Sequence, residues 1–318
     1  MNQQLAPVTV AAAVIFRDGK YLIGRRENSG NCANLWEFPG GKLEPGETPA
    51  KCAVRECREE LGVEIIPGEL LWETEHKYPD RLIRLIFLRA ELPSGEPARS
   101  VHRELAWVAP GEFPRYEFCP ADGELIARLD LELRLTSGAV SVRPIRRTDG
   151  ELLLRWMNDP EVLRYYEGRD HAFTEEQVRE SFLEDCAESR HIVEYEGVPI
   201  GYIQIYRLDE EGFSAYEYPP VEGTVYGIDQ FIGEPAYWNR GIGRTFLKMV
   251  LGELIGQRGA EAVILDPHAD NTRAIRCYEA CGFRKLKFLP AHELHEGKLR
   301  DCWLMEYRRG SGEDKRED

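Results

Sequence analysis

The chain has 318 residues, 42% of them hydrophobic, which is enough for two ordinary domains with packed cores. Its formal net charge of −15 argues against general binding to nucleic acids or anionic membranes. The apolar run that ends at Arg17-Asp18-Gly19 follows no basic segment and is too short to span a bilayer, so we expect a cytoplasmic protein. Eight irregularly spaced cysteines without a CxxC motif favour reduced thiols.

Alternating apolar and polar residues in the first half predict β-strands bounded by turn-forming residues. These strands are expected at 8–16, 21–25, 69–78 and 81–90. A closing helix is predicted over 120–135, where apolar residues recur at helical spacing. The small and polar residues at 136–139 then predict a linker between two domains.

Another helix is predicted after the tight turn at Pro45-Gly46. Thr48 suits the N-cap and Pro49 the first helical position, while Gly62 is expected to end the helix. This helix therefore begins directly after a loop that is rich in glycine.

Three glutamates of this helix, Glu56, Glu59 and Glu60, follow one another at i, i+3 and i+4 and so share one face. A row of acids is most often only a solvated helix face. Here the upstream Gly40 and Gly41 allow a backbone carbonyl to turn toward the same place. Oxygen ligands around an open site suit Mg²⁺ or Mn²⁺, which bridge carboxylates to phosphate oxygens. The segment is a candidate site for a metal and a pyrophosphate.

The stretch from Gly41 to Val63 fills every fixed position of the Nudix box, G-x5-E-x7-R-E-U-x-E-E-x-G-U, with Cys57 at the aliphatic position. Residues 7–135 resemble the MutT-type Nudix hydrolases, also through NLWEFPGGKLEPGETPA, KYPDRLIRLIFLRA and PADGELIARL. The resemblance implies an α/β/α sandwich with a mixed sheet. It also implies hydrolysis of a nucleoside triphosphate to the monophosphate and pyrophosphate, with 8-oxo-dGTP and pyrimidine triphosphates among the substrates of relatives.

The same resemblance implies roles for individual residues of the box. The catalytic residues that bind the divalent metal would be Glu56, Glu59 and Glu60. The carbonyl of Gly41 would complete this metal set. Glu47 would pair with Arg55 and so hold the loop to the helix.

Other implied positions lie outside the box. Val101 stands where relatives carry a further acidic ligand, with His102 and Glu104 close to it in sequence. The residues expected at the nucleobase are Arg26, Phe38 and Asp122. For Asp122 an alternative stays open, because an aspartate at that place would also serve as a helix N-cap.

The second half predicts a mixture of strands and helices without an internal repeat. Strands are expected at 140–143, 190–196, 199–207, 226–232 and 262–265. Helices are expected near 148–158, 174–187, 246–251 and 271–281. Thr174 is the predicted N-cap of the second of these helices. The charged residues 310–318 predict a disordered tail.

The turn YWNRGIGRT at 237–245 leads from a strand into a helix, where free backbone N–H groups can hold a pyrophosphate. The order strand, loop, helix, strand, helix resembles the GNAT acetyltransferases, whose Q/R-x-x-G-x-G/A turn binds acetyl-CoA. Trp238 takes the Gln/Arg place. Blocks such as VYGIDQFIGEPAYWNRGIG and AVILDPHADNTRAIRCYEACGF resemble aminoglycoside 6'-N-acetyltransferases across 140–309. The resemblance implies contacts to acetyl-CoA by Phe231, Arg240, Gly241, Ile242, Gly243, Arg244, Thr245 and Asn271.

Acetyl transfer to an amine needs a base, because an ammonium group cannot attack a thioester until it loses a proton. Asp229 is the candidate base, although a strand-end aspartate satisfied by local N–H groups would look the same. Backbone N–H groups near Phe231 could stabilise the oxyanion. Tyr278 could protonate the departing thiolate or be a core tyrosine. Asn271 could touch the coenzyme or act as an N-cap alone.

The sequence therefore predicts a bifunctional enzyme of the α/β and α+β classes. A Nudix domain is expected at 1–136, a GNAT domain at 140–309 and a tail at 310–318. The expected partners are small molecules, namely a nucleoside triphosphate, acetyl-CoA and a cationic amine such as an aminoglycoside. Two alternatives stay open: a Nudix half that only binds nucleotide or supports structure, and a polyamine or another small amine as acetyl acceptor.

Overall fold

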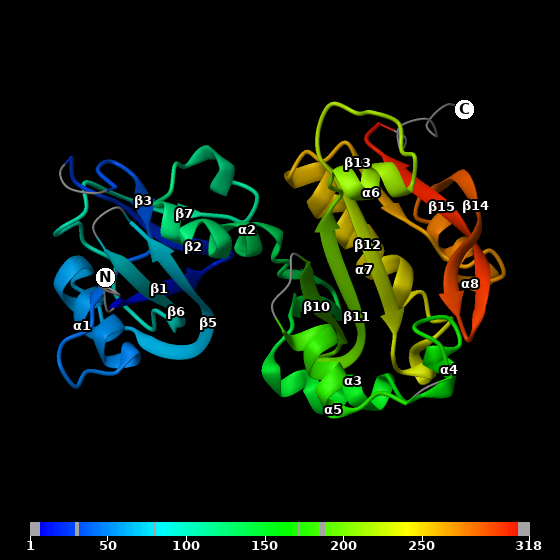
Figure 1. Cartoon of the computed structure of the whole chain (residues 1–318), viewed down its shortest axis with the longest axis horizontal. Helices are drawn as coiled ribbons and strands as arrows, with labels where there is room; N and C mark the ends of the chain where they lie inside the picture. The colour runs from blue at the N-terminus through cyan, green and yellow to red at the C-terminus, as the bar shows by residue number, and fades with distance from the viewer. Residues whose placement is uncertain (1–6, 29–31, 79–80, 171, 185–187, 311–318) are drawn as a thin grey trace, which may run out of the picture. The chain divides into compact units, whose positions relative to one another are not determined.

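The computed structural model describes residues 7–28, 32–78, 81–170, 172–184 and 188–310, which form two compact units divided between Asp130 and Leu131 (Figure 1). The tail expected at 310–318 lies, after Gly310, outside the described residues. Within the described residues, none of the helices combines the length and the apolar character needed to cross a bilayer.

The first unit is built on a mixed sheet with the strand order β3-β2-β1-β6-β5, to which β4 adds beside β1 and β7 beside β2. Its strands are β1 (Val8–Arg17), β2 (Lys20–Arg25), β3 (Trp36–Glu37), β4 (Gly40–Lys42), β5 (Ile66–Lys77), β6 (Leu82–Glu91) and β7 (Glu104–Val108). β1 and β6 run parallel, with Ala12 opposite Phe87, whereas β1 and β2 form an antiparallel hairpin.

The sheet of the first unit is covered by one helix on each face. Side chains alternate along β1, so Ala12 and Val14 face a core that includes Leu125 and Leu129 of α2 (Gly123–Leu131). The intervening residues of β1 face a second core, which includes Cys57 and other residues of α1 (Pro49–Leu61). The expected α/β/α sandwich is therefore confirmed.

The ends of α1 are those that the sequence predicts. The Thr48 hydroxyl accepts a hydrogen bond from the Lys51 N–H at 3.3 Å, Pro49 is the first helical residue, and Gly62 ends the helix with φ +66°. Each cap follows from local chemistry, because an N-terminal oxygen satisfies a free N–H group and glycine adopts the left-handed conformation without strain.

The boundary region between the units differs from the expected one. The helix expected over 120–135 begins with a 3-10 turn at 120–122 and ends, as α2, at Leu131. Residues 135–137 then form β8 (Leu135–Ser137), a hairpin partner of β9 (Val140–Pro144). The linker expected at 136–139 is therefore wrong. Small and polar residues mark a hairpin turn as well as a linker, and only the pairing of β8 with β9 separates the two.

The second unit carries a sheet with the strand order β14-β15-β13-β12-β11-β10-β9-β8 (Figure 1). The strands after β9 are β10 (Ser189–Tyr195), β11 (Val198–Arg207), β12 (Val225–Ile232), β13 (Ala262–Leu265), β14 (Arg284–His295) and β15 (Lys298–Arg308). β12 and β13 run parallel, and the other neighbouring pairs in this order are antiparallel.

Helices cover both faces of this second sheet. α7 (Ile242–Leu251) and α8 (Thr272–Glu279) pack in a core with Ile203 of β11. The neighbouring residue of β11, Tyr202, faces a different core with α3 (Gly150–Trp156) and α5 (Glu175–Val178). Thr174 caps α5 as predicted, since its side chain accepts from the Gln177 N–H. The short helices α4 (Pro160–Leu163) and α6 (Glu210–Ala215) are not predicted by the sequence pattern.

β12 and β13 are paired along only part of their length, which leaves an open edge in the sheet of the second unit. Their register runs from Val225 opposite Ala262 to Gly227 opposite Ile264, yet β12 continues to Ile232. β13 ends shortly before Pro267, which has no N–H group with which to extend the ladder. Residues 228–232 therefore offer an unpaired backbone edge toward the gap left by β13.

The contact of β4 with β1 predicts a stability effect. A Cβ atom on Gly40 would lie 2.2 Å from the Ala11 carbonyl oxygen, and backbone atoms cannot move aside easily. We expect Gly40→Ala to destabilise the first unit by roughly 1–3 kcal/mol in urea unfolding. The matched control is Gly123→Ala, since Gly123 is helical with no atom within 4 Å of an added Cβ and should be neutral or gain up to about 1 kcal/mol. Equal stability of the two variants would contradict this account.

Candidate functional sites

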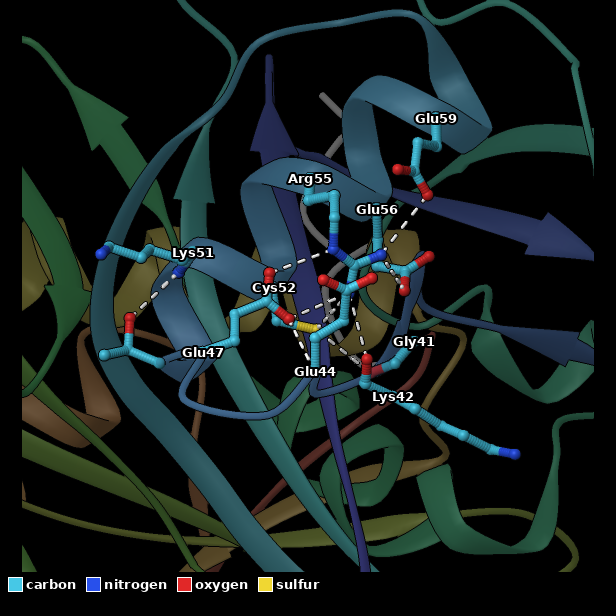
Figure 2. A network of polar contacts seen from close by, with 10 residues as sticks. Gly41, Lys42, Glu44, Glu47, Lys51, Cys52, Arg55, Glu56 and Glu59 are labelled. Carbon is cyan, nitrogen blue, oxygen red and sulfur yellow. Dashed lines mark hydrogen bonds and ion pairs between the residues drawn. The ribbon is translucent and has the colours of Figure 1, made fainter.

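The first candidate site is organised by Arg55, which joins the glycine-rich loop to α1 (Figure 2). Its Nε and Nη2 each donate to Glu47 at 3.0 Å, and Nη2 also donates to the Lys42 carbonyl at 3.1 Å. The hydrogen bonds from Arg55, with one from the Glu44 N–H, lower the pKa of Glu47 to about 2. Nη1 donates to Glu56 at 2.7 Å. Arg55 therefore fixes the loop to the helix and orients the Glu56 carboxylate.

The two glycines of β4 lie directly against the carboxylates of α1. The Gly40 N–H donates to Glu60 Oε2 at 3.2 Å. A Cβ on Gly41 would lie 2.1 Å from Glu56 Oε1, so a larger residue here would displace this carboxylate. The Glu59 carboxylate is 58% exposed and lies 3.4 Å from Arg55 Nη1. The structure thus brings Gly41, Glu56 and Glu60 together, with Glu59 on the outer side.

The electrostatics of Glu60 are those of a crowded carboxylate. Burial raises its pKa to about 7, and the charges of Glu37 and Glu56 act in the same direction. His102 and the hydrogen bond from Gly40 oppose the rise. The donor atoms around Glu60 are hard oxygens, which is the set that Mg²⁺ or Mn²⁺ requires. A divalent cation held here would favour the ionised form of Glu60.

The position expected for a further acidic ligand does not supply one. Val101 is 54% exposed, and Glu104 lies 3.5 Å from Arg25 in an ion pair. His102 is buried instead, with Nε2 3.4 Å from Glu37 Oε1. Glu37 was missed by the sequence reasoning. A single acid between the apolar residues of the WEFPGG segment was the available signal.

The three residues expected at the nucleobase are brought together around Glu37. Arg26 Nη1 donates to Glu37 at 2.6 Å, and the Phe38 N–H donates to Asp122 Oδ1 at 3.5 Å. Burial, followed by the charge of Glu37, raises the pKa of Asp122 well above its usual range. Asp122 thus contacts the segment between β3 and β4, which is distant in the sequence. Phe38 is 3% exposed and belongs to the core, so it supports this region from the interior of the domain.

The second candidate site lies where β12 parts from β13. A cavity of about 670 Å³ is lined there by the end of β12, the turn before α7 and residues along most of α8. Its lining includes Phe231, Arg240, Gly241, Ile242, Gly243, Arg244 and Asn271. Thr245, which was expected to contact the coenzyme, is absent from the lining that the structure describes. Its hydroxyl donates to the Gly241 carbonyl at 3.3 Å and so supports the turn.

The start of α7 presents an anion-binding arrangement to this cavity. Gly241 is the N-cap with φ +79°, and within the described residues its helix has no side-chain cap. The first N–H groups of α7, at Ile242 and Gly243, are therefore available to a ligand. Arg244 and Arg276 line the same cavity and add positive charge. This end of the cavity suits a pyrophosphate.

Trp238, which departs from the usual Gln/Arg of the turn, has a structural role. Its Nε1 donates to the Ile232 carbonyl at 2.8 Å, which ties the turn to the end of β12. The guanidinium of Arg273 lies 3.9 Å from its ring centroid, in a cation–π contact. Trp238 therefore positions an arginine beside the cavity while the backbone of the turn stays free.

A smaller cavity of about 390 Å³ adjoins the first one, and the two share Tyr165, Tyr166, Gln230, Asn271 and Tyr278 in their linings. Asp229 lies in the smaller cavity, where Gln204 Nε2 donates to its Oδ2 at 2.7 Å. Burial, with the charge of Asp266, raises the pKa of Asp229 to about 7. A carboxyl group with that pKa can accept a proton near neutral pH.

Tyr278 and Asn271 lie where the two cavities meet. Burial raises the pKa of Tyr278, so its hydroxyl is protonated at neutral pH and can donate a proton. Asn271 caps α8 by accepting from the Ala274 N–H at 3.2 Å, and it also lines both cavities. Asn271 therefore caps α8 and also lies where it can contact a ligand.

The smaller cavity is acidic beyond Asp229, and two of its further acids, Asp266 and Glu293, were missed by the sequence reasoning. Glu167, Asp266 and Glu293 also line it. Asp266 accepts from the Tyr216 hydroxyl at 3.0 Å and lies 3.1 Å from His292 Nε2. The available signal was the position of Asp266 directly after the buried strand β13, where the carboxyl ends of parallel strands meet.

Comparisons with known proteins agree with both sites. Residues 10–128 match the family model of the NUDIX domain, and residues 146–290 match that of the acetyltransferase (GNAT) domain. CTP pyrophosphohydrolase of Escherichia coli (strain K12) is 39% identical over 119 residues, which are 37% of this chain and 88% of that protein. The 8-oxo-dGTP diphosphatase of the same organism is 36% identical over 121 residues, 38% of this chain and 94% of that protein.

For the second domain, the aminoglycoside N(6')-acetyltransferase type 1 of Klebsiella pneumoniae is 27% identical over 154 residues, which are 47% of this chain and 76% of that protein. The Nudix box and its cluster of carboxylates lie in the first match, and the turn before α7 lies in the second. The chain therefore belongs to the Nudix hydrolases through its first domain and carries a GNAT acetyltransferase domain as its second.

Proposed function

We propose that the first domain hydrolyses a nucleoside triphosphate to the monophosphate and pyrophosphate with the help of Mg²⁺ or Mn²⁺. The observation that carries this proposal is the packing of Glu56 and Glu60 against Gly40 and Gly41, with Arg55 as the fixed counter-charge. The similarity to a CTP pyrophosphohydrolase and an 8-oxo-dGTP diphosphatase supports the substrate class.

In this reaction the carboxylates of the chain would hold the metal ion in place. Glu56, Glu59 and Glu60 would bind the metal, which neutralises the triphosphate and lowers the pKa of the attacking water. Burial raises the pKa of Asp122 well above its usual range, which favours the protonated form that can donate as well as accept at the edge of a base. Such a group would suit a purine such as that of 8-oxo-dGTP.

A glutamine scan of the box tests the hydrolytic proposal. We expect Glu56→Gln to lower pyrophosphate release by roughly 100-fold or more, because a neutral amide is a poor ligand for Mg²⁺. Chelation of the metal should abolish release, and added Mg²⁺ should restore it. The matched control is Glu64→Gln, since Glu64 is exposed just after the same helix and pairs with Arg58. Release that is absent from wild type across a nucleotide panel would instead favour the alternative of a nucleotide-binding or structural module.

For the second domain we propose acetyl transfer from acetyl-CoA to a primary amine. Its support is the pair of adjoining cavities, one with an anion-binding helix start and one with four acids, and Tyr278 where they meet. Asp229 takes the proton from the amine, whose nitrogen attacks the acetyl carbonyl. As the C–S bond of the thioester breaks, Tyr278 gives its proton to the thiolate. Backbone N–H groups of β12 on the side left open by β13 can hold the oxyanion.

The role of Asp229 predicts a pH profile. Because its pKa is raised to about 7, the fraction of ionised base grows as pH rises through 7, so kcat/KM should rise over the same range. Asp229→Asn should lower kcat roughly 100-fold or more and abolish the rise of kcat/KM with pH. CoA binding should change little. Asp209→Asn is the control, because Asp209 is exposed at the N-cap of α6 and asparagine keeps the cap. An unchanged rate in Asp229→Asn would exclude this base.

The acidic cavity supports a polycationic acceptor, and the relative's name supports an aminoglycoside acetylated at its 6'-amine. The alternative acceptor is a polyamine or another small amine. Thiol release from acetyl-CoA should be at least about tenfold faster, as kcat/KM, with kanamycin-type compounds than with spermidine, because only the sugar fixes the amine in one orientation. Compounds that lack the 6'-amine are the control. Equal rates with spermidine would favour the alternative.

The proposed substrates also bear on location. Nucleoside triphosphates and acetyl-CoA are cytoplasmic metabolites, and the cysteines that the structure describes are free thiols. Both observations support a cytoplasmic protein.

A further inference from the structure

A group of side chains beside the acidic cavity lies outside the roles assigned above. It consists of His268, which follows β13, and of Glu293 and His295 on β14. One potential ligand atom from each residue lies within 4.8 Å of the other two. We propose that these three residues bind a divalent transition metal, with zinc as the occupant.

The fold brings the three residues together by strand pairing. Glu293 and His295 are two positions apart on β14, so their side chains point to the same face. The backbone of His268 forms an isolated bridge with Cys302 on β15, and β15 is the hairpin partner of β14. The cluster therefore links the segment after β13 to both strands of the C-terminal hairpin.

An ordinary ion pair explains only part of this cluster. His268 Nε2 lies 3.0 Å from Glu293 Oε2 in an ion pair, yet it has no hydrogen bond of good geometry among the described residues. The His295 ring meets the His268 ring edge-on, with centroids 4.7 Å apart. The side chain of His295 is 2% exposed, and its Nδ1 has no hydrogen-bond partner among the described residues. A buried polar nitrogen without a partner is costly, and a metal ion would supply the partner.

The donor set indicates which metal would bind. Two imidazole nitrogens and one carboxylate form a borderline-soft set that suits Zn²⁺, whereas Mg²⁺ prefers oxygen ligands alone. Tetrahedral zinc at about 2.0–2.1 Å from each ligand places the ligand atoms roughly 3.4 Å apart. The cluster is slightly wider than that, so small side-chain rotations would close it. Three protein ligands leave the fourth position to water.

A metal bound to these three residues would stabilise one wall of the smaller cavity, in which we expect the acetyl acceptor to bind. His268 and Glu293 both line that cavity, and the segment that carries His268 also carries Asp266 and leads to Asn271. Joining this segment to β14 would fix the acidic wall opposite β12. The metal would thus organise the binding of the cationic acceptor, while the site itself is independent of which amine is used.

Cobalt substitution tests this proposal on the full chain. Metal is first removed with a chelator, and Co²⁺ is then titrated while visible absorption is recorded. Tetrahedral Co²⁺ with imidazole ligands absorbs strongly, whereas Co²⁺ held by the oxygen ligands of the Nudix box absorbs weakly. We expect one equivalent of strongly absorbing Co²⁺ per chain, which Zn²⁺ displaces and Mg²⁺ does not. The melting temperature of the second unit should rise when Zn²⁺ is added.

Variants locate the absorbing ion. His295→Ala and Glu293→Gln should each weaken Co²⁺ binding by at least about 100-fold, since even a residue that only orients a ligand is worth 10–100-fold. His292→Ala is the matched control, because His292 lies on the same strand and contacts Asp266 instead. If His295→Ala fails to fold, Glu293→Gln carries the test. Weak absorption alone, or strong absorption that persists at unchanged affinity in Glu293→Gln, would overturn the proposal.

Discussion

Crowded carboxylates, partly withdrawn from water, are the constraint on which both domains depend. Burial raises the pKa of such groups, and neighbouring like charges add to the rise, as Glu60 and Asp229 show with values of about 7. The chain offsets this cost only in part. Arg55 serves the first cluster and Gln204 hydrogen-bonds Asp229 in the second. The remaining charge is complementary to cations, which the proposed metal and the proposed amine would supply.

Backbone features hold the acids in place in both domains. In the first, Gly40 lets β4 approach the backbone of β1 closely, and at Gly41 the Glu56 carboxylate takes the space that a Cβ atom would fill. In the second, the early end of β13 leaves the last residues of β12 unpaired, and the left-handed Gly241 starts α7 with free N–H groups. Each feature removes something that an ordinary element would have, namely a Cβ atom, a paired strand edge or a side-chain cap.

The local parts of this architecture were predictable, because they follow from short-range rules. The caps Thr48 and Gly62 and the shared face of three glutamates need only helix geometry. The hairpin of β8 and β9 was mistaken for a linker, since a turn of small residues looks alike in both settings. Thr245 was assigned to the coenzyme by its place in a motif, whereas its hydroxyl turns back to Gly241.

The sequence by itself determined the two family motifs, their spacing and hence the two chemistries, because each motif lies within one continuous segment. Tertiary structure alone decided which other residues join them. Glu37 and His102, far apart in the sequence, both act on the charge of Glu60, and Asp266 lies near Asp229 only because the parallel register sets the end of β13 beside the middle of β12. No periodicity encodes such neighbours, since sheet order and register arise from non-local pairing.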